Sequence, residues 1–412
     1  MRKLILSLLS LVLMLSACVK NETLRRFTIY RPVYVTKAEV REGVAFQKPQ
    51  TIDKLGNIIV YKNYLLATEL DKGIHVIDAQ NAGAMKKIAF IPIPGNHGLA
   101  IRNDVLYANC YDDLFAVDIA DVNQLKLVGV TENVFQSLNT IGGYSTNGDL
   151  VIKDWQAIDT MVKQDFIDGY SMLHSSNPLL LSSAPVTNAS FNGSQVSTGG
   201  SMARFTIVNQ YLYAVDRFSL STFDLSIGNA PHRTDSTMVN WNVETIYPFQ
   251  NNLFIGSQTG MFIYSLATPS HPSYRSQFNH ANVCDPVIAN ENHAFVTLRS
   301  GTQCQGITNQ LDVLDIADLN HPTLVKTYPM SNPHGLGMQN HTLFLCDGEK
   351  GLRVFDATDV NNITETRRFE IGWATDAIVL PSRAYILTKE SIYVYDYQSA
   401  KEVSYVGHIQ KR

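Results

Sequence analysis

Two short motifs place a histidine directly before a glycine and a leucine, in Asn96-His97-Gly98-Leu99 and in Pro333-His334-Gly335-Leu336. Neutral imidazole is the commonest metal ligand in proteins, and a neighbouring glycine lets a ligand or a second backbone approach closely. Each motif stands where an apolar strand begins, and carboxylates occupy near-equivalent points of other strands. The candidate site residues are therefore His97, Glu244, Asp285, His334 and Asp376.

Two imidazoles and three carboxylates that meet in one place could hold a divalent cation such as Zn²⁺, Mn²⁺ or Ca²⁺, or a polar ligand. The competing interpretation is structural. Each side chain would then supply hydrogen bonds at the start of its own strand, because buried polar groups need partners in any case.

Motifs of the common enzyme classes are absent from the chain: there is no G-x-S-x-G, H-E-x-x-H, G-x-x-x-x-G-K-[ST] or G-x-G-x-x-G. An enzyme built on this chain would have to be a metal-assisted hydrolase or lyase that uses His97, Asp285, His334 and Asp376. We favour a binding role and keep this activity as the alternative.

The elements that position these residues form a repeat with seven copies. Each copy contains an apolar strand and, usually 12 or 13 residues later, the end of a second apolar strand, which in six copies is Asp. The first strands include residues 65–67, 106–108, 212–214, 253–255, 294–296, 343–345 and 384–386. The second strands are residues 73–78, 113–118, 220–224, 260–265, 310–315, 351–356 and 391–396.

A repeat period near 40 residues, with several short β-branched and aromatic strands in each unit, is typical of propeller blades. We therefore predict an all-β fold, a β-propeller with seven blades of about 40 residues. Its innermost strands would surround a central channel, with the candidate site residues at the channel mouth. The Asp that ends six of the second strands is expected to accept hydrogen bonds from the next turn, which is a structural role.

One interval between repeats is 106 residues long and predicts an insertion, residues 131–200, between the second and third repeats. The alternative is a degenerate blade within this segment, because residues 149–155 have the pattern of a strand. Residues 182–201 are rich in Ser, Asn, Gly and Thr. This composition predicts a mobile surface loop.

The closing strands have the form Leu/Ile-x-Val-x-Asp and are preceded by strands of the Leu-Tyr-Ala type. In this they resemble the LVIVD-repeat β-propellers found in many bacterial surface and periplasmic lipoproteins. The resemblance extends over residues 55–410, apart from Ser265 in place of a closing Asp and apart from the insertion. It implies the propeller fold and the cell envelope, and it implies no particular reaction.

Residues 1–17 have the pattern of a lipoprotein signal peptide, with Arg2 and Lys3 before an apolar run that is too short to span a bilayer. Leu15-Ser16-Ala17-Cys18 resembles a lipobox, so Cys18 is expected to become the acylated first residue of the mature chain. Two or three acyl chains anchor a protein durably to a membrane. By the same resemblance, Val19 in place of Asp favours the outer membrane; exposure to the periplasm or to the medium stays open.

Residues 18–50 are expected to form a lipid-anchored tether and an N-terminal strand, and residues 51–410 the propeller. The strand-like residues 27–35 could pair with the last blade and close the ring. Face packing between the first and last blades is the alternative closure.

The net charge of −4 offers no basic field for nucleic acid. Of the five cysteines, Cys284 and Cys304 flank the fifth hairpin, and an exported protein is allowed a disulfide between them. Cys110 and Cys346 end apolar strands and are expected to be buried. Altogether, the sequence predicts a lipid-anchored cell-envelope scaffold that binds a protein or a glycan, with a divalent cation at the channel mouth as a possible cofactor.

Overall fold

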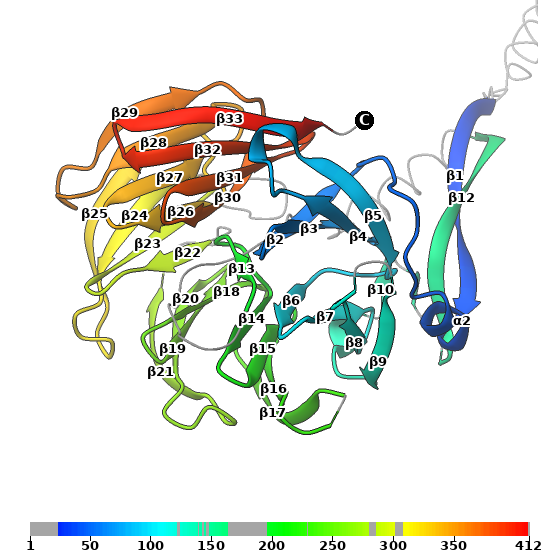
Figure 1. The fold of residues 1–412 in the computed structure, drawn as a ribbon. Helices are drawn as coiled ribbons and strands as arrows, with labels where there is room; N and C mark the ends of the chain where they lie inside the picture. The colour runs from blue at the N-terminus through cyan, green and yellow to red at the C-terminus, as the bar shows by residue number, and fades with distance from the viewer. Residues whose placement is uncertain are drawn as a thin grey trace, which may run out of the picture.

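The computed structural model describes residues 24–410 except 122–123, 139, 142–143, 146–147, 164–195, 229, 280–285 and 301–307. Seven antiparallel sheets of four strands stand around a common axis, so the predicted seven-bladed β-propeller is confirmed (Figure 1). One of the sheets gains a short fifth strand. Each blade is built from one continuous stretch of chain, numbered here as blades 1 to 7 in chain order.

The strands of the blades have the following bounds. Blade 1 contains β2 (Leu55–Tyr61), β3 (Tyr64–Glu69), β4 (Gly73–Asp78) and β5 (Lys86–Pro92), and blade 2 contains β6 (Leu99–Arg102), β7 (Val105–Cys110), β8 (Asp113–Asp118) and β9 (Lys126–Thr131). Blade 3 contains β14 (Phe205–Val208), β15 (Tyr211–Val215), β16 (Ser219–Asp224) and β17 (His232–Met238), and blade 4 contains β18 (Val243–Phe249), β19 (Asn252–Ser257), β20 (Gly260–Ser265) and β21 (Ser273–Asn279). Blade 5 contains β22 (Val287–Ala289), β23 (His293–Leu298), β24 (Gln310–Asp315) and β25 (Thr323–Pro329), and blade 6 contains β26 (Leu336–Gln339), β27 (Thr342–Cys346), β28 (Leu352–Asp356) and β29 (Thr364–Phe369). Blade 7 contains β30 (Ala374–Leu380), β31 (Arg383–Thr388), β32 (Ser391–Ser399) and β33 (Glu402–Gln410).

The repeated Asp at the end of the third strand of a blade has the structural role that its position predicts. Its carboxylate accepts a hydrogen bond from the N–H group two residues later, over 2.8–3.0 Å, in blades 1, 2, 3, 5 and 6. Ser265 replaces it in blade 4 with its hydroxyl, 3.2 Å from the N–H of Ala267. In blade 7, Asp396 instead binds Arg383, because β32 continues past this position. The residue therefore fixes the turn to the outer strand.

Neighbouring blades pack through apolar faces, and the same packing closes the ring. Ile58, Leu65 and Ile77 of blade 1 share one buried cluster with Leu387 and Ile392 of blade 7. The prediction that the N-terminal strand pairs with the last blade is wrong, and the alternative of face packing is confirmed. β33 already fills the outer position of blade 7, so no strand position is left open there.

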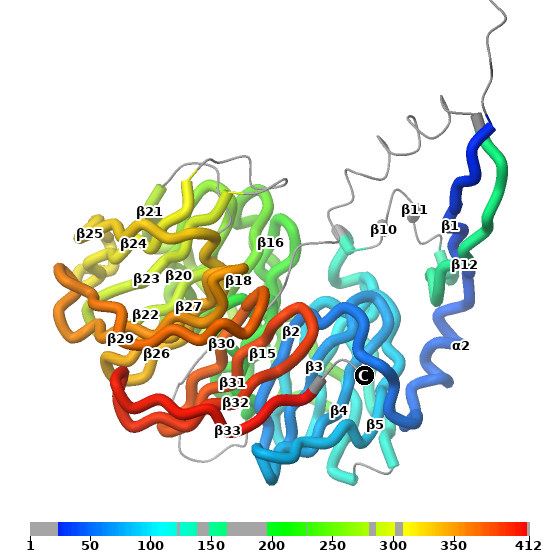
Figure 2. The backbone as a smooth tube through the Cα atoms, turned by 90° about the horizontal axis from the view of Figure 1, so that it is seen from above, coloured from blue at the N-terminus to red at the C-terminus, as the bar shows by residue number. Residues whose placement is uncertain are grey.

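The N-terminal strand β1 (Leu24–Thr36) pairs instead with β12 (Leu150–Lys163), from the insertion, in a two-stranded antiparallel ribbon. We call this ribbon the arm. It lies beside the ring and is not an eighth blade (Figure 2). The short helix α2 (Lys37–Glu42) follows it, opened by a capping box between Thr36 and Glu39. Two further short strands of the insertion, β10 (Thr140–Ile141) and β11 (Tyr144–Ser145), pair with each other.

The end of the insertion enters the central channel. We call residues 196–203 the channel segment. Its strand β13 (Thr198–Gly199) pairs with β2 of blade 1, while Val196 bridges to Arg102 of blade 2. Further along, the Ser201 hydroxyl accepts a hydrogen bond from the N–H of Leu336 in blade 6, over 2.7 Å. The carbonyl of Ala203 accepts one from the N–H of Ile246 in blade 4, also over 2.7 Å.

The prediction of a mobile surface loop over residues 182–201 is therefore wrong for residues 196–201, and the rest of that stretch lies outside the described residues. Small side chains explain the difference, because they let a backbone pass between the inner strands. A Cβ atom at Gly200 would lie 2.6 Å from the carbonyl oxygen of Ala377 and 2.6 Å from a carboxylate oxygen of Asp376. The composition that suggested a loop instead suits a segment inside a narrow channel.

Candidate functional site

The candidate site residues share a region of the fold but not one register. To compare blades, we count the paired residues of each blade's first strand, starting at the turn to the second strand. The fourth paired residue is Leu99 in blade 2, Ile246 in blade 4, Leu336 in blade 6 and Ala377 in blade 7. His97, Glu244 and His334 stand two residues before it. Asp376 stands one residue before it, and neighbouring side chains of an extended strand point to opposite sides.

His97 serves the joint between blades 1 and 2. Its Nε2 lies 3.3 Å from a carboxylate oxygen of Asp71, in the preceding blade. Its N–H donates to the side-chain oxygen of Asn109 over 2.8 Å, and its carbonyl accepts a hydrogen bond from the side chain of Asn57 over 2.5 Å. Through these contacts, His97 holds blades 1 and 2 together.

Glu244 is buried between arginines. Burial raises the pKa of its carboxyl group, while the charges of Arg299 and Arg204 and a hydrogen bond from Gln258 oppose the rise. The Gln258 amide donates to the Glu244 carboxylate over 3.2 Å. Burial also lowers the pKa of both arginines. The arrangement is an internal charge cluster across the inner ends of blades 3, 4 and 5.

His334 is a buried imidazole, and neither of its ring nitrogens has a hydrogen-bond partner among the described residues. Burial, aided by the charges of Arg299 and Lys389, lowers its pKa well below the usual value, so the ring is neutral at pH 7. Its edge meets the ring of Trp373 with 5.9 Å between the ring centres. The indole Nε1 of Trp373 also lacks a partner in the described chain.

Asp376 faces the channel segment. The Ser201 hydroxyl lies 3.5 Å from one of its carboxylate oxygens, and the other oxygen has no partner within the described ranges. Burial raises the pKa of Asp376 to about 8, which keeps the carboxyl group protonated at neutral pH.

The structure does not bring the described candidates together. In the described part of the chain, no group of three or more His, Cys, Asp or Glu side chains could hold a metal ion. Asp285 lies outside the described residues, as do Cys284 and Cys304 with their predicted disulfide. Ligand binding at the channel mouth therefore stays a prediction. Cys110 and Cys346 are buried free thiols, as predicted.

A cavity of about 1050 Å³ opens between blades 7 and 1, where the ring closes. The chain entering blade 1 contributes Ile52 and Asp53, and Lys72 comes from the β3–β4 turn of this blade. Blade 7 supplies Trp373, before its first strand, and Lys389 from its β31–β32 turn. Tyr393 of β32 completes the aromatic part of the wall.

The wall of this cavity carries both acidic and basic side chains. The Lys389 amine lies 3.6 Å from the centre of the Trp373 ring, and the Lys72 amine lies 3.6 Å from a carboxylate oxygen of Asp53. Glu69 is buried at the edge and binds the N–H groups of Asp53 and Lys54, over 2.9 and 2.6 Å. Burial opposes ionisation of Glu69, but hydrogen bonds from His75 and from these amides outweigh it and lower its pKa. Glu69 thus fixes the loop that forms one wall.

Sequence reasoning missed this cavity, because its walls come from the two ends of the propeller chain. Residues 50–53 and 371–373 are more than 300 positions apart and carry no shared motif. A weak signal was available in Trp373, one of three tryptophans in the chain, which follows a glycine in a turn rather than lying on a strand.

No protein-family model matches this chain, and no curated protein matches it. Solved structures do match. The chain is similar to the computationally designed Ika8 protein, with 10% identity, a TM-score of 0.51, and coverage of 89% of this chain and 91% of that one. It is also similar to a protein from Lactobacillus plantarum, with 11% identity, a TM-score of 0.50, and coverage of 86% and 96%. These likenesses show the fold alone. None of the helices within the described ranges is long and apolar enough to cross a membrane.

Proposed function

We propose that this chain is a lipid-anchored cell-envelope propeller of the LVIVD-repeat kind, and that it binds a glycan in the cavity between blades 7 and 1. The cavity is the observation that carries the proposal. Its volume of about 1050 Å³ is that of a site for a compact ligand or a few sugar rings. The repeat motif and the blade geometry support the family.

The chemistry of the cavity wall fits a polyhydroxylated, uncharged ligand. Tyr393 and Trp373 provide aromatic surface, on which the C–H face of a sugar ring can stack. Asp53 and Glu390 accept hydrogen bonds, and Lys72 donates them. Because donors and acceptors of both charges are interspersed, no single sign of ligand charge is favoured. A sugar hydroxyl group, which both donates and accepts, matches such a wall.

Location in the outer membrane is part of this proposal and is supported by Val19 in place of Asp. The lipid anchor is supported by the lipobox ending at Cys18. The test is incorporation of labelled palmitate during growth. The wild-type chain should carry the label and remain with the membrane fraction, whereas a Cys18→Ser variant should carry none. Equal labelling of both chains would refute the lipid anchor.

Glycan binding is tested on an array of envelope glycans and soluble oligosaccharides with the purified protein. We expect a subset of glycans to be retained and Tyr393→Ala to weaken their binding by about tenfold, which is the loss of one stacking contact. Tyr274→Ala is the matched control, because Tyr274 is an exposed tyrosine on the outer strand of blade 4 and far from the cavity wall. No retained glycan, or equal binding by both variants, would refute the proposal.

A further inference from the structure

The arm carries an unusual share of the exposed apolar surface. Twelve large hydrophobic side chains are exposed in the described part of the chain, and six of them lie on β1 and β12. They are Leu24, Tyr30, Val33, Tyr34, Leu150 and Met161. Leu24 and Met161 are 55% and 58% exposed, and both lie near the end of the arm where β1 begins. A soluble ribbon without a partner does not need this concentration of apolar side chains.

The charge of the arm is opposite to that of the whole chain. Its two strands contain five lysines and arginines and two aspartates, a net charge of +3, whereas the complete chain has a net charge of −4. Arg25, Arg26 and Arg31 are exposed along β1. Arg26 pairs with Asp159, so one of the two aspartates is already neutralised locally. The remaining field of the arm is cationic.

One end of the arm is built into the ring and the other projects from it. At the base, Val151 and Ile152 of β12 are buried in the core cluster of blades 1 and 2. The Lys37 amine, which follows β1, lies 3.0 Å from a carboxylate oxygen of Asp112 and 2.9 Å from one of Asp113. Figure 2 shows the opposite end of the ribbon, where β1 begins, extending away from the blades. A rigid base and a projecting apolar, cationic end suit contact with a second surface.

The proposed acylation site at Cys18 places the projecting end of the arm close to the membrane surface. Five residues separate Cys18 from Leu24, and an extended chain covers about 3.5 Å per residue. The projecting end of the arm must therefore lie within roughly 20 Å of the membrane that holds the lipid. Exposed tyrosines, apolar side chains and arginines are the residue types that concentrate at the interface between lipid headgroups and water.

We propose that the arm is a membrane-contact element whose projecting end meets an anionic lipid surface end-on. Leu24, Arg26 and Met161, on one face of the ribbon, and Arg25, on the other, would then all reach the headgroups. The arginines of β1 would bind lipid phosphates, and the buried base would transmit this orientation to blade 2. The inference depends on the envelope location in the proposed function but not on the glycan site.

The test uses the acyl-free chain that starts at Val19, since the first buried core residue of the described chain is Val40. Binding to vesicles that contain 30% phosphatidylglycerol is compared with binding to pure phosphatidylcholine vesicles by co-sedimentation. We expect binding to the anionic vesicles alone, weakened by added salt. Arg25→Glu with Arg26→Glu, at the projecting end, should weaken it by about 30-fold or more, since each basic group near an anionic surface contributes severalfold.

Arg233→Glu with Lys401→Glu is the matched control, because it makes the same charge change on exposed residues of the ring. It should leave vesicle binding within about a factor of two. Leu24→Ser with Met161→Ser tests the apolar contact and should also weaken binding, while circular dichroism checks that each variant is folded. Absence of binding to anionic vesicles, equal binding to neutral vesicles, or equal loss in the arm and ring variants would overturn the proposal. Pairing of the arm with a strand of an envelope protein would produce the first of these results.

Discussion

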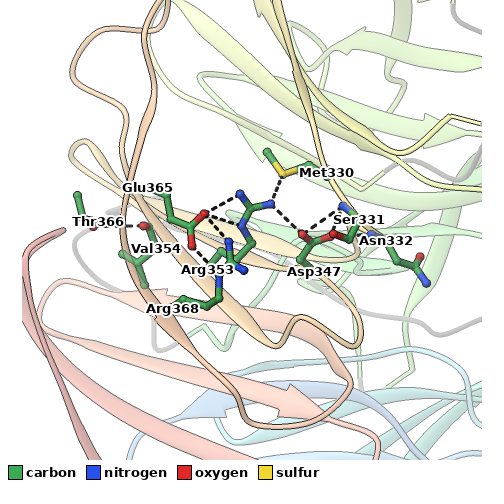
Figure 3. A network of polar contacts seen from close by, with 9 residues as sticks. All are labelled: Met330, Ser331, Asn332, Asp347, Arg353, Val354, Glu365, Thr366 and Arg368. Carbon is green, nitrogen blue, oxygen red and sulfur yellow. Dashed lines mark hydrogen bonds and ion pairs between the residues drawn. The ribbon is translucent and has the colours of Figure 1, made fainter.

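Two aspartate–arginine pairs in neighbouring blades should respond very differently to loss of the aspartate. In blade 6, Asp347 binds Arg353 over 2.8 Å and also accepts hydrogen bonds from the N–H groups of Ser331 and Asn332 (Figure 3). Asp347 is fully buried, and the Arg353 side chain is 14% exposed. In blade 7, Asp396 binds Arg383 over 2.6 Å, but these side chains are 45% and 32% exposed.

The magnitudes follow from burial. Breaking a buried pair by removing one partner costs about 3–5 kcal/mol, mainly because the other groups stay buried without a partner. Glu365 still holds the Arg353 guanidinium over 2.7 Å, so we expect the lower part of that range, about 3 kcal/mol, for Asp347→Ala. For Asp396→Ala we expect at most about 1 kcal/mol, because water replaces the lost contact.

The assay is urea unfolding at pH 7, followed by circular dichroism and by tryptophan fluorescence. Asp347→Ala should lower the unfolding midpoint clearly, and Asp396→Ala should move it little. The variant Asp347→Asn keeps one acceptor for the two N–H groups and should fall between them. Equal shifts for Asp347→Ala and Asp396→Ala would refute the reasoning from burial.

Two further predictions concern the channel segment. Gly200→Ala should lower the free energy of unfolding by about 1–3 kcal/mol, because the added Cβ overlaps backbone and carboxylate atoms in a packed region. Gly83→Ala is the control, because the nearest atom to its added Cβ is 3.5 Å away, and it should change the free energy of unfolding by less than about 1 kcal/mol. Equal effects of the two variants in urea unfolding would contradict the close packing at Gly200. Asp376 takes up a proton on folding, since its pKa rises from about 3.9 in the unfolded chain to about 8, so its contribution to stability is complete below pH 4 and is lost as pH rises through 8. Urea titrations at a series of pH values test this. Between pH 4 and 8, the free energy of unfolding of the wild-type chain should fall relative to that of Asp376→Asn. If the difference between the two free energies does not change with pH, the carboxyl group is not buried and protonated as described.

The features predicted correctly depend on residues close together in the chain. A blade is one continuous segment, so alternating apolar residues and a closing Asp such as Asp356 reveal its strands and turns without knowledge of the rest. The number of blades then follows from counting. Burial of Cys110 and Cys346 was accessible for the same reason, because both end apolar strands.

The features predicted wrongly, or missed, depend on distant contacts. β1 and β12 pair although more than 100 residues separate them, and the sequence of residues 27–35 does not indicate which strand they pair with. Ser201 and Asp376 meet because the channel segment lies against the first strand of blade 7, about 175 positions further along the chain. The position of Asp376 was misjudged by one residue: counted from the turn, Asp376 corresponds to Thr245 of blade 4 and not to Glu244.

The channel segment also changes how the repeats depend on one another. In an open array of repeats, each unit touches only its neighbours, and one end can unfold while the other persists. Here the channel segment contacts the inner strands of blades 1, 2, 4, 6 and 7, so one short stretch of chain connects five blades that are not all neighbours. If one of these blades unfolds, the channel segment loses that contact and its contacts with the other blades are weakened. We therefore regard the ring as one cooperative unit, tied together at its inner edges by a segment of its own chain.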